Sequence, residues 1–221
     1  SCLILLNARP NDSEPFNITV EGEIVNPVSS IARIEGNGQK FQTRLDAKGY
    51  FKIAASIGKA GYFKFINDEN APLYLTPGDK LYLTLDTKQF DESLRYRGKG
   101  AAVNRYLIRK YLIMEQQLYN RELAVFSLDK EKFEQKIETL FASILTELQG
   151  LKKPGSDAKK PFLKIEQELL LLEKARIYFS YPKEYRKNTG RRAEDMSNLF
   201  THLIGKIDID DGKRLEHEEY R

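Results

Sequence analysis

Apolar and polar side chains alternate with a period of two along much of residues 18–96. In the first such run, Ile18, Val20 and Ile24 are separated by polar or small residues. Successive side chains of a strand point to opposite faces of a sheet, so this alternation predicts half-buried strands. Residues 46–49 suit a hairpin turn, and residues 76–79 suit a type II turn with Pro77 and Gly78 at its centre. Strands are predicted at 18–24, 41–45, 51–55, 62–66, 73–75, 81–85 and 94–96.

The spacing of apolar residues becomes helical after Gly98 and Gly100. From there they recur every three or four positions, which places them on one side of a helix. Ser127 is expected to cap the second helix, Pro182 to end the third after Tyr181, and Gly205 to close the fourth. Helices are predicted at 107–118, 133–148, 162–181 and 196–204, with a linker at 150–160.

Strands that precede helices, instead of alternating with them, indicate an α+β fold. Short strands with turn signals at regular intervals are typical of a small antiparallel β-sandwich. We therefore expect an N-terminal antiparallel β-sandwich followed by a helical segment of about four helices. The predicted division is a flexible lead or signal remnant at 1–15, a β-sandwich domain at 16–98 and a helical domain at 99–221.

The composition of the chain excludes several classes of function. Among its 221 residues, 36 Lys and Arg oppose 32 Asp and Glu, and the two signs are mixed along the sequence. A nucleic-acid-binding field needs a net basic stripe, so nucleic acid is not an expected partner. One Cys allows no internal disulfide and no CxxC redox pair, and two His allow no multi-histidine metal site. We expect no cofactor and no metal.

The N-terminus carries a short apolar run from Cys2 to Leu6. The run is too short to span a membrane. It resembles the end of a signal peptide, with small Ala8 at an acceptable cleavage position. A second interpretation makes Cys2 a lipid-modified residue that tethers the chain to a membrane, and a third makes the run a buried strand. The first two interpretations both predict export to the periplasm or the cell envelope.

Two groups of side chains could form a partner-binding surface. One group is basic and lies near several aromatic residues. Such a cluster can bind single-stranded nucleic acid, complement the C-terminal dipole of a helix or dock a protein, and we favour the last two roles. The other group is tyrosines, which either lie on exposed strand faces or fill the seam between sheet and helices. The residues are Arg186, Lys187, Arg191 and Arg192, with Lys183 beside them, and Tyr62, Tyr74 and Tyr82.

Other motifs carry no catalytic prediction. Gly98, Lys99 and Gly100 lack the remaining residues of a phosphate-binding loop. The acidic stretch 208–219 places Lys where a calcium loop of the EF-hand type needs Gly. His202 and His217 stand without a nucleophile motif. We expect no catalytic residue in this chain.

Four stretches in order are similar to one known family. They are FNITVEG at 16–22, LDAKGYF at 45–51, APLYLTPGD at 71–79 and YRGKGAAVNRYL at 96–107, and IDIDD at 207–211 adds to them. Together they resemble the N-terminal accessory region of TlpA-like thiol:disulfide interchange proteins of Gram-negative bacteria. In that family a small β domain and helices precede a thioredoxin-like domain with a CxxC motif. The resemblance covers about residues 16–221, and the CxxC domain is not among them.

The resemblance implies a role without chemistry of its own. We expect an exported, non-catalytic accessory module that positions a thioredoxin-like domain in cis, or the client protein of such a domain. The stretch 211–221 resembles the start of another helix, which favours a chain that continues past Arg221. The alternative is a free-standing cell-envelope module that binds a glycan, a peptide or a protein. An unrecognised enzyme is a third hypothesis.

Overall fold

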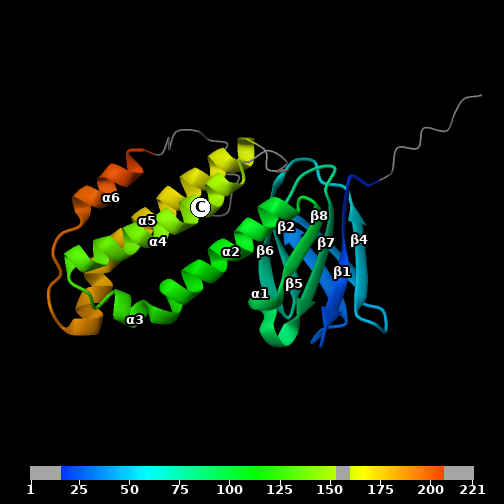
Figure 1. Ribbon diagram of the computed structural model, residues 1–221, viewed down its shortest axis with the longest axis horizontal. Helices are drawn as coiled ribbons and strands as arrows, with labels where there is room; N and C mark the ends of the chain where they lie inside the picture. Colours follow the sequence, from blue (N-terminus) through cyan, green and yellow to red (C-terminus); the bar gives the residue numbers. More distant parts are fainter. Residues whose placement is uncertain (1–15, 153–159, 207–221) are drawn as a thin grey trace, which may run out of the picture.

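Two stacked sheets and a layer of helices make up the fold, as seen in a computed structural model that describes residues 16–152 and 160–206. In Figure 1 the sheets form one side of the molecule and the helices extend away from them. The fold class is therefore α+β, as the sequence predicts. Cys2 and the rest of the lead at 1–15 lie outside the described residues, as do 153–159 and 207–221.

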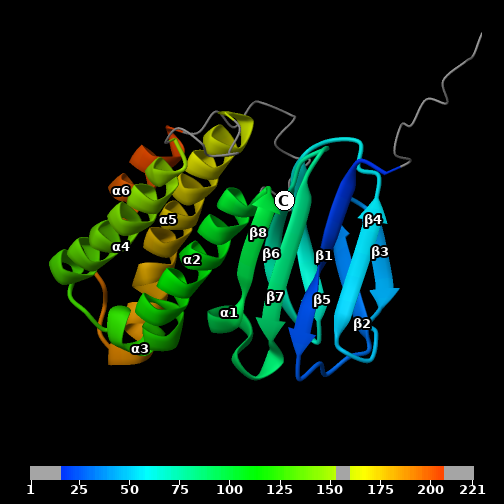
Figure 2. The same cartoon turned by 45° about the vertical axis from the view of Figure 1, so that its right-hand side comes forward.

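Each sheet has four strands. One sheet has the order β4-β1-β7-β8 and the other the order β3-β2-β5-β6. In Figure 2 the strands of both sheets run side by side across one half of the view, with helices α2, α4 and α5 beside them. The strands are β1 (Ile18–Val25), β2 (Ile31–Gly36), β3 (Gln39–Arg44), β4 (Tyr50–Ala55), β5 (Gly61–Asn67), β6 (Glu69–Leu75), β7 (Lys80–Asp86) and β8 (Arg95–Lys99).

The core of the sandwich is built from the inward positions of the alternating strands. Ile18, Val20 and Ile24 of β1 are all buried, in agreement with the sequence pattern. Phe51 of one sheet and Phe65 of the other stack with ring centroids 5.3 Å apart, so the two sheets share one apolar interior. This shared interior confirms a sandwich as the arrangement of the sheets.

The strand pairing differs from the predicted pattern in two places. Strand β2 was not predicted, although it lies in the middle of its sheet and buries Ala32 and Ile34. Strands β1 and β7 pair in parallel, whereas every other strand pair is antiparallel. The chain leaves the first sheet after β1 and re-enters it later, and the residue pattern of a strand does not reveal the direction of its neighbour.

The predicted turns form as expected. In the turn at 46–49, the amide of Gly49 donates to Asp46 O at 3.0 Å, and Gly49 has a φ of 82°. At 76–79, the amide of Asp79 donates to Thr76 O at 2.9 Å, and Gly78 has a φ of 95°. Glycine is suited to both positions because it adopts positive φ without steric cost.

In the described part of the chain, four longer helices follow the last strand, with one 3-10 turn and one single-turn helix among them, and another such pair lies between β7 and β8. The longer helices correspond to the four that the sequence predicts. The bounds are η1 (Thr87–Gln89), α1 (Phe90–Ser93), α2 (Ala101–Gln117), η2 (Tyr119–Arg121), α3 (Glu122–Val125), α4 (Lys130–Gly150), α5 (Lys160–Thr189) and α6 (Ser197–Ile204). None of the helices in 16–152 and 160–206 is long and apolar enough to cross a membrane.

Two predicted helix ends are wrong. Asp129, not Ser127, caps α4, because its carboxylate accepts from the amide of Lys132 at 3.1 Å. Helix α5 does not stop at Tyr181 but runs through Pro182 to Thr189. Tyr181 is buried beside Phe133 of α4, with ring centroids 4.2 Å apart. Such packing offsets the hydrogen bond that proline cannot donate.

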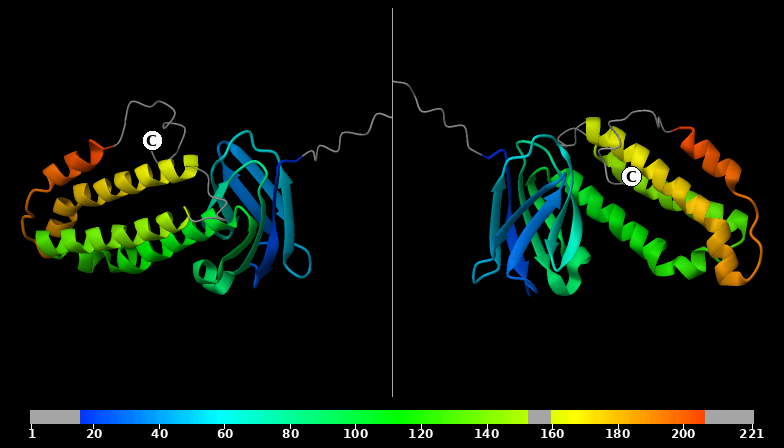
Figure 3. Two further views of the ribbon diagram at one scale, coloured as in Figure 1. Left: turned by 45° about the horizontal axis from the view of Figure 1, so that its top comes forward. Right: turned by 180° about the vertical axis from the view of Figure 1, so that it is seen from behind.

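Helix α2 joins the sandwich to the other helices. It begins directly after β8 and contacts both β8 and β6. Its buried Asn104 accepts from the amide of Tyr74 at 2.8 Å and donates to the carbonyl of Tyr74 at 3.0 Å. The side chain thereby forms hydrogen bonds with both the backbone donor and the backbone acceptor of Tyr74, near the end of β6. From this anchor α2 runs away from the sheets, and α4 and α5 lie alongside it (Figure 3).

Candidate functional site

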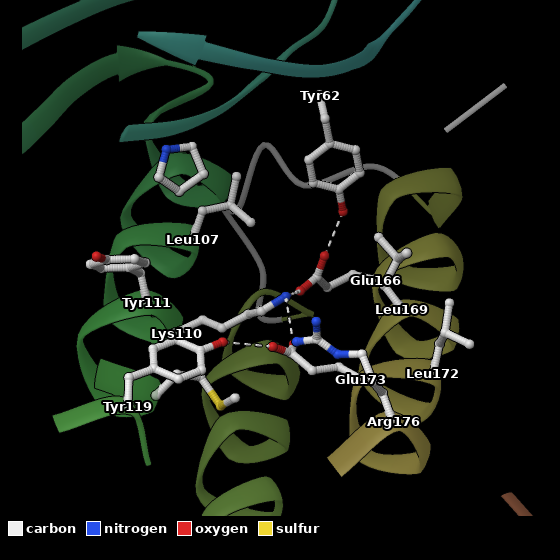
Figure 4. Close-up of a pocket in the computed structure, with 12 residues that line it drawn as sticks. Tyr62, Leu107, Lys110, Tyr111, Tyr119, Glu166, Leu169, Leu172, Glu173 and Arg176 are labelled. Atoms are coloured by element: carbon white, nitrogen blue, oxygen red, sulfur yellow. Dashed lines mark hydrogen bonds and ion pairs between the residues drawn. The ribbon is translucent and has the colours of Figure 1, made fainter. Parts of the chain in front are cut away.

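A groove of about 390 Å³ lies where helices α2 and α5 approach strands β5 and β6 (Figure 4). Residues that are far apart in the sequence meet in it. Its apolar lining comes from both helices, and its polar groups gather at one side. The lining residues are Tyr62, Pro72, Leu107, Lys110, Tyr111, Met114, Tyr119, Glu166, Leu169, Leu172, Glu173 and Arg176.

The first turns of α5 are held against the sandwich by an aromatic cluster. Phe162 is fully buried, and its ring packs edge-on to Tyr74 at 4.7 Å between centroids. Tyr62 and Tyr106 also surround it, at 6.2 Å and 6.1 Å. One helical turn further on, this anchor places the side chain of Glu166 in the interior.

Glu166 is a fully buried carboxylate with three donors. The hydroxyl of Tyr62 donates to Oε2 at 2.5 Å, and the hydroxyl of Tyr106 donates to Oε1 at 2.9 Å. Lys110 Nζ forms an ion pair with Oε1 at 2.8 Å. A buried charge is stable only when it is paired and hydrogen-bonded, and both conditions are met here. The carboxylate thus ties α5 to β5 and to α2.

A second carboxylate extends this network toward the opening of the groove. Lys110 Nζ lies 3.8 Å from Glu173 Oε2, and the hydroxyl of Tyr119 donates to Glu173 Oε1 at 3.0 Å. Figure 4 shows the four residues Glu166, Lys110, Glu173 and Tyr119 in one connected chain of interactions. The side chains of Lys110 and Glu173 are both 19% exposed, so water reaches this end of the network.

The phenols of the network are held in their protonated form. Burial and the adjacent Glu166 carboxylate raise the pKa of Tyr62 and of Tyr106 well above its usual value. Burial and Glu173 likewise raise the pKa of Tyr119. A tyrosine in this state donates hydrogen bonds and does not act as a base at neutral pH. The three hydroxyls therefore serve to fix the carboxylates.

The groups that remain for a ligand are apolar surface, two aromatic rings and one cation. Tyr111 is 37% exposed and Tyr119 is 44% exposed, and both line the groove. Within the described part of the chain, the guanidinium of Arg176 has no hydrogen bond or ion pair assigned to it. Aromatic rings next to apolar walls and a guanidinium are typical of surfaces that bind other molecules.

The three tyrosines singled out in the sequence do not share one surface. Tyr62 and Tyr74 lie in the seam between the sandwich and the helices, where Tyr74 is only 5% exposed. Tyr82 lies on the outer face of the other sheet and is half-buried. Its hydroxyl donates to Glu23 at 2.9 Å, and the guanidinium of Arg97 lies 5.0 Å from its ring.

The basic residues of the sequence gather at the end of α5. Arg186 and Lys187 are exposed in its last turns, and Arg191 and Arg192 are exposed just beyond it. They are not part of the groove between α2 and α5, although α5 contributes to both. Cations in the last turn also complement the dipole of the helix.

The glycine motif of the sequence and His202 are not part of the groove. Gly98, within β8, has a φ of 89°, and Gly100, between β8 and α2, has a φ of 94°. His202 is an exposed residue of α6. Residues 16–152 and 160–206 contain no group of three or more His, Cys, Asp or Glu placed to hold a metal ion. His217 and the acidic stretch 208–219 lie outside these ranges.

A separate group of carboxylates lies near α1. Burial raises the pKa of Asp91 to about 6, and three neighbouring carboxylates add to the effect. The phenol of Tyr96 in the adjoining β8 has a raised pKa for the same two reasons, burial first and the charge of Asp91 second. The neighbours of Asp91 are Glu115, Glu69 and Glu92.

The groove is the feature that sequence reasoning missed. Glu166 follows Phe162 by four residues, and Glu173 follows Glu166 by seven, so all three fall on one side of α5. A glutamate that recurs on the apolar side of a helix is the one signal in the sequence for this site. The partners of these carboxylates on β5 and α2 come from distant parts of the chain.

Comparison of the chain with family models, with curated proteins and with solved structures found no match in any of the three.

Proposed function

We propose that this chain is a non-catalytic accessory module of the cell envelope that binds and positions another polypeptide. The polypeptide is a thioredoxin-like domain in cis or a client protein of such a domain. The groove between α2 and α5 is the observation that carries the proposal. It combines exposed aromatic rings and apolar walls at a junction between two parts of the fold.

The chemistry of the groove favours binding over catalysis. General acid–base catalysis needs a group that can take up and release a proton within reach of a substrate. Glu166 is fully buried and already accepts three hydrogen bonds, while Lys110 is paired with two carboxylates. The interactions of Glu166 and Lys110 therefore hold the helices in place. What faces the opening suits an apolar or aromatic side chain of a partner.

The choice of a thioredoxin-like partner comes from the sequence resemblance. The stretches similar to the accessory region of TlpA-like proteins include residues 71–79 and 96–107. These stretches form β6 with the following turn, and β8 with the start of α2. Each stretch contributes one residue to the lining of the groove, Pro72 from the first and Leu107 from the second. The residues that carry the resemblance are thus close to the residues that we propose to contact the partner.

Hydrogen exchange tests the proposal directly. The chain is mixed with a purified thioredoxin-like domain of a TlpA-like protein whose second CxxC cysteine is replaced by serine. We expect slower exchange in residues 107–119 and 166–176. Leu172→Glu places a charge in the groove and should weaken binding at least about tenfold. Leu145→Glu on α4, which is 37% exposed and outside the groove, is the matched control.

Two results would count against the proposal. Unchanged exchange in both segments at saturating partner would remove the groove as the binding site. Reduction of insulin disulfides by this chain alone would show that it is not an accessory module, since it has one cysteine and we assign it no redox chemistry.

A free-standing binding module is the second candidate. The observation that favours it is Tyr82, whose ring lies under Arg97 on the outer face of a sheet. Aromatic rings on such a face can stack on sugars. A glycan array tests this candidate, because signal that disappears in Tyr82→Ala with the fold intact would support it. A blank array would weaken it.

A further inference from the structure

In its second half, beyond the groove, one face of α5 is basic and exposed. Residues 176, 179, 183, 186 and 187 fall within an arc of about 100° on a helix of 3.6 residues per turn. All five side chains are exposed. The side chain of Lys183 is 85% exposed and that of Lys187 is 71% exposed. We call Arg176, Phe179, Lys183, Arg186 and Lys187 the α5 stripe.

The α5 stripe lies in a segment with a surplus of positive charge. Residues 176–206 contain seven Lys or Arg and three Asp or Glu, a surplus of four positive charges. Residues 1–175 carry a net charge of +3 and residues 207–221 a net charge of −3, which gives the entire chain its net charge of +4. Glu184 forms ion pairs with two cations of the stripe, at 3.3 Å from Lys187 and 4.0 Å from Lys183. Of the three segments, residues 176–206 thus carry the largest surplus of positive charge for their length.

A single large apolar side chain projects from the middle of the stripe. Phe179 is 69% exposed, which is the highest exposure among the large hydrophobic residues of 16–152 and 160–206. Its ring lies 5.2 Å from that of Phe200 on α6, so one edge is supported and the rest faces solvent. A single exposed aromatic ring is normal on a protein surface, but this ring lies among four exposed cations on the same side of α5.

We propose that the α5 stripe docks on an anionic membrane surface, with Phe179 inserted at the level of the lipid headgroups. Exposed cations on one side of a helix are attracted to acidic lipids, and a single aromatic residue adds apolar contact at the interface. A lipid surface suits the stripe better than an acidic peptide does. The cations project from a convex helix, whereas the groove that suits a polypeptide lies toward the strands.

This docking does not depend on the proposed function of the groove. The groove uses α2, the first half of α5 and the edge of the sandwich, and Arg176 is the one residue that it shares with the stripe. Variants at Lys183 and Arg186 therefore alter the stripe while leaving the groove residues in place. A failure of one proposal can be told apart from a failure of the other.

Vesicle co-sedimentation tests the proposal with the full 221-residue chain. Vesicles contain about 30 mol% phosphatidylglycerol in phosphatidylcholine, and pure phosphatidylcholine vesicles serve as the neutral comparison. We expect sedimentation with the anionic vesicles at about 0.1 M NaCl and release at about 0.5 M NaCl, because salt screens surface charge. Neutral vesicles should retain little protein.

Four variants connect the binding to the stripe. Each basic residue near an anionic surface contributes about fivefold to partitioning, so Lys183→Gln with Arg186→Gln should reduce it about 25-fold. Lys40→Gln with Lys48→Gln removes the same charge from the sandwich and should cause a much smaller loss. Phe179→Ala should reduce partitioning about tenfold. Val28→Ala, at a residue that is 65% exposed in the sandwich, is its control.

Three outcomes overturn the proposal. The first is equal sedimentation with anionic and neutral vesicles, or none with either. The second is binding that the double variant of the stripe and the double variant of the sandwich reduce equally, which would indicate the net charge alone. The third is tight binding to polyglutamate without binding to vesicles, which would make the stripe a surface for an acidic protein. Circular dichroism of each variant confirms that it is folded.

Discussion

Replacing Glu166 by glutamine should destabilise the protein strongly, although the two side chains have nearly the same shape. The carboxylate is fully buried and accepts hydrogen bonds from Tyr62 and Tyr106 at 2.5 Å and 2.9 Å. Both hydroxyls can rotate to accommodate an amide. Lys110 cannot, because its ammonium group only donates and its ion pair at 2.8 Å loses the negative partner.

The expected loss is about 3 kcal/mol. Removing one partner of a buried ion pair costs about 3–5 kcal/mol. The lower end applies here, since the Lys110 side chain is 19% exposed and retains Glu173 at 3.8 Å. For a chain of this size, each kcal/mol moves the melting temperature by about 2–4 °C. Glu166→Gln should therefore melt about 6–12 °C below the wild type.

Urea unfolding followed by circular dichroism measures the effect. Glu147→Gln is the matched control, because Glu147 also joins two helices through its ion pair with Arg109 at 2.9 Å. That pair is exposed, with the Arg109 side chain at 65%, so its removal should cost less than about 1 kcal/mol. The slope of the transition should be the same in both variants, which would show that the change lies in stability alone.

Equal, small losses in Glu166→Gln and Glu147→Gln would refute the reasoning. They would mean that the buried carboxylate contributes no more than an exposed one. A double variant adds a further check. Lys110→Met combined with Glu166→Gln removes both charges, so the double variant leaves no unpaired buried charge. It should therefore lose less free energy of unfolding than the two single variants together.

Two further predictions concern backbone packing and pH. In Gly22→Ala, the new Cβ would lie 1.9 Å from Leu83 O, so we expect a loss of at least about 4 kcal/mol in urea unfolding. Gly58→Ala has open space and should change stability by less than about 0.5 kcal/mol. The pKa of Asp91 is raised from 3.8 to about 6 in the folded state, so the folded protein binds this proton more tightly and stability is lost as pH rises through that window. Asp91→Asn should therefore raise the melting temperature at pH 8, by an amount equivalent to about 1 kcal/mol after screening by water. This gain in melting temperature should disappear near pH 4. An equal gain at both pH values would contradict the reasoning.

Much of the secondary structure can be predicted from local patterns. The alternation of Ile18, Val20 and Ile24 predicts a strand with one buried face, and the structure buries all three. The turn around Gly49 follows from its tolerance of positive φ. The stripe of Phe133 and Ile137 predicts α4, and both are fully buried. In each case the signal lies within one turn or one strand.

Predictions fail where a distant partner decides the outcome. Pro182 signals a helix end, but the packing of Tyr181 on Phe133 carries α5 past it. The seam between sheet and helices is the favoured of two positions for Tyr62 and Tyr74, and the structure places both there; the sequence does not indicate that Tyr82 lies on the outer face of the other sheet. Contacts between residues far apart in the chain override local preference in these places.

The sequence by itself determined the order of the elements, the α+β class and the apolar face of each strand and long helix. Those properties depend on side-chain periodicity, which a single chain segment contains in full. Only the tertiary structure decided that β1 and β7 run parallel, and that Glu166 meets Tyr62, Tyr106 and Lys110. Between 56 and 104 residues separate Glu166 from these partners. No periodic pattern connects positions so far apart, and the cost of burying a lone carboxylate is what brings them together.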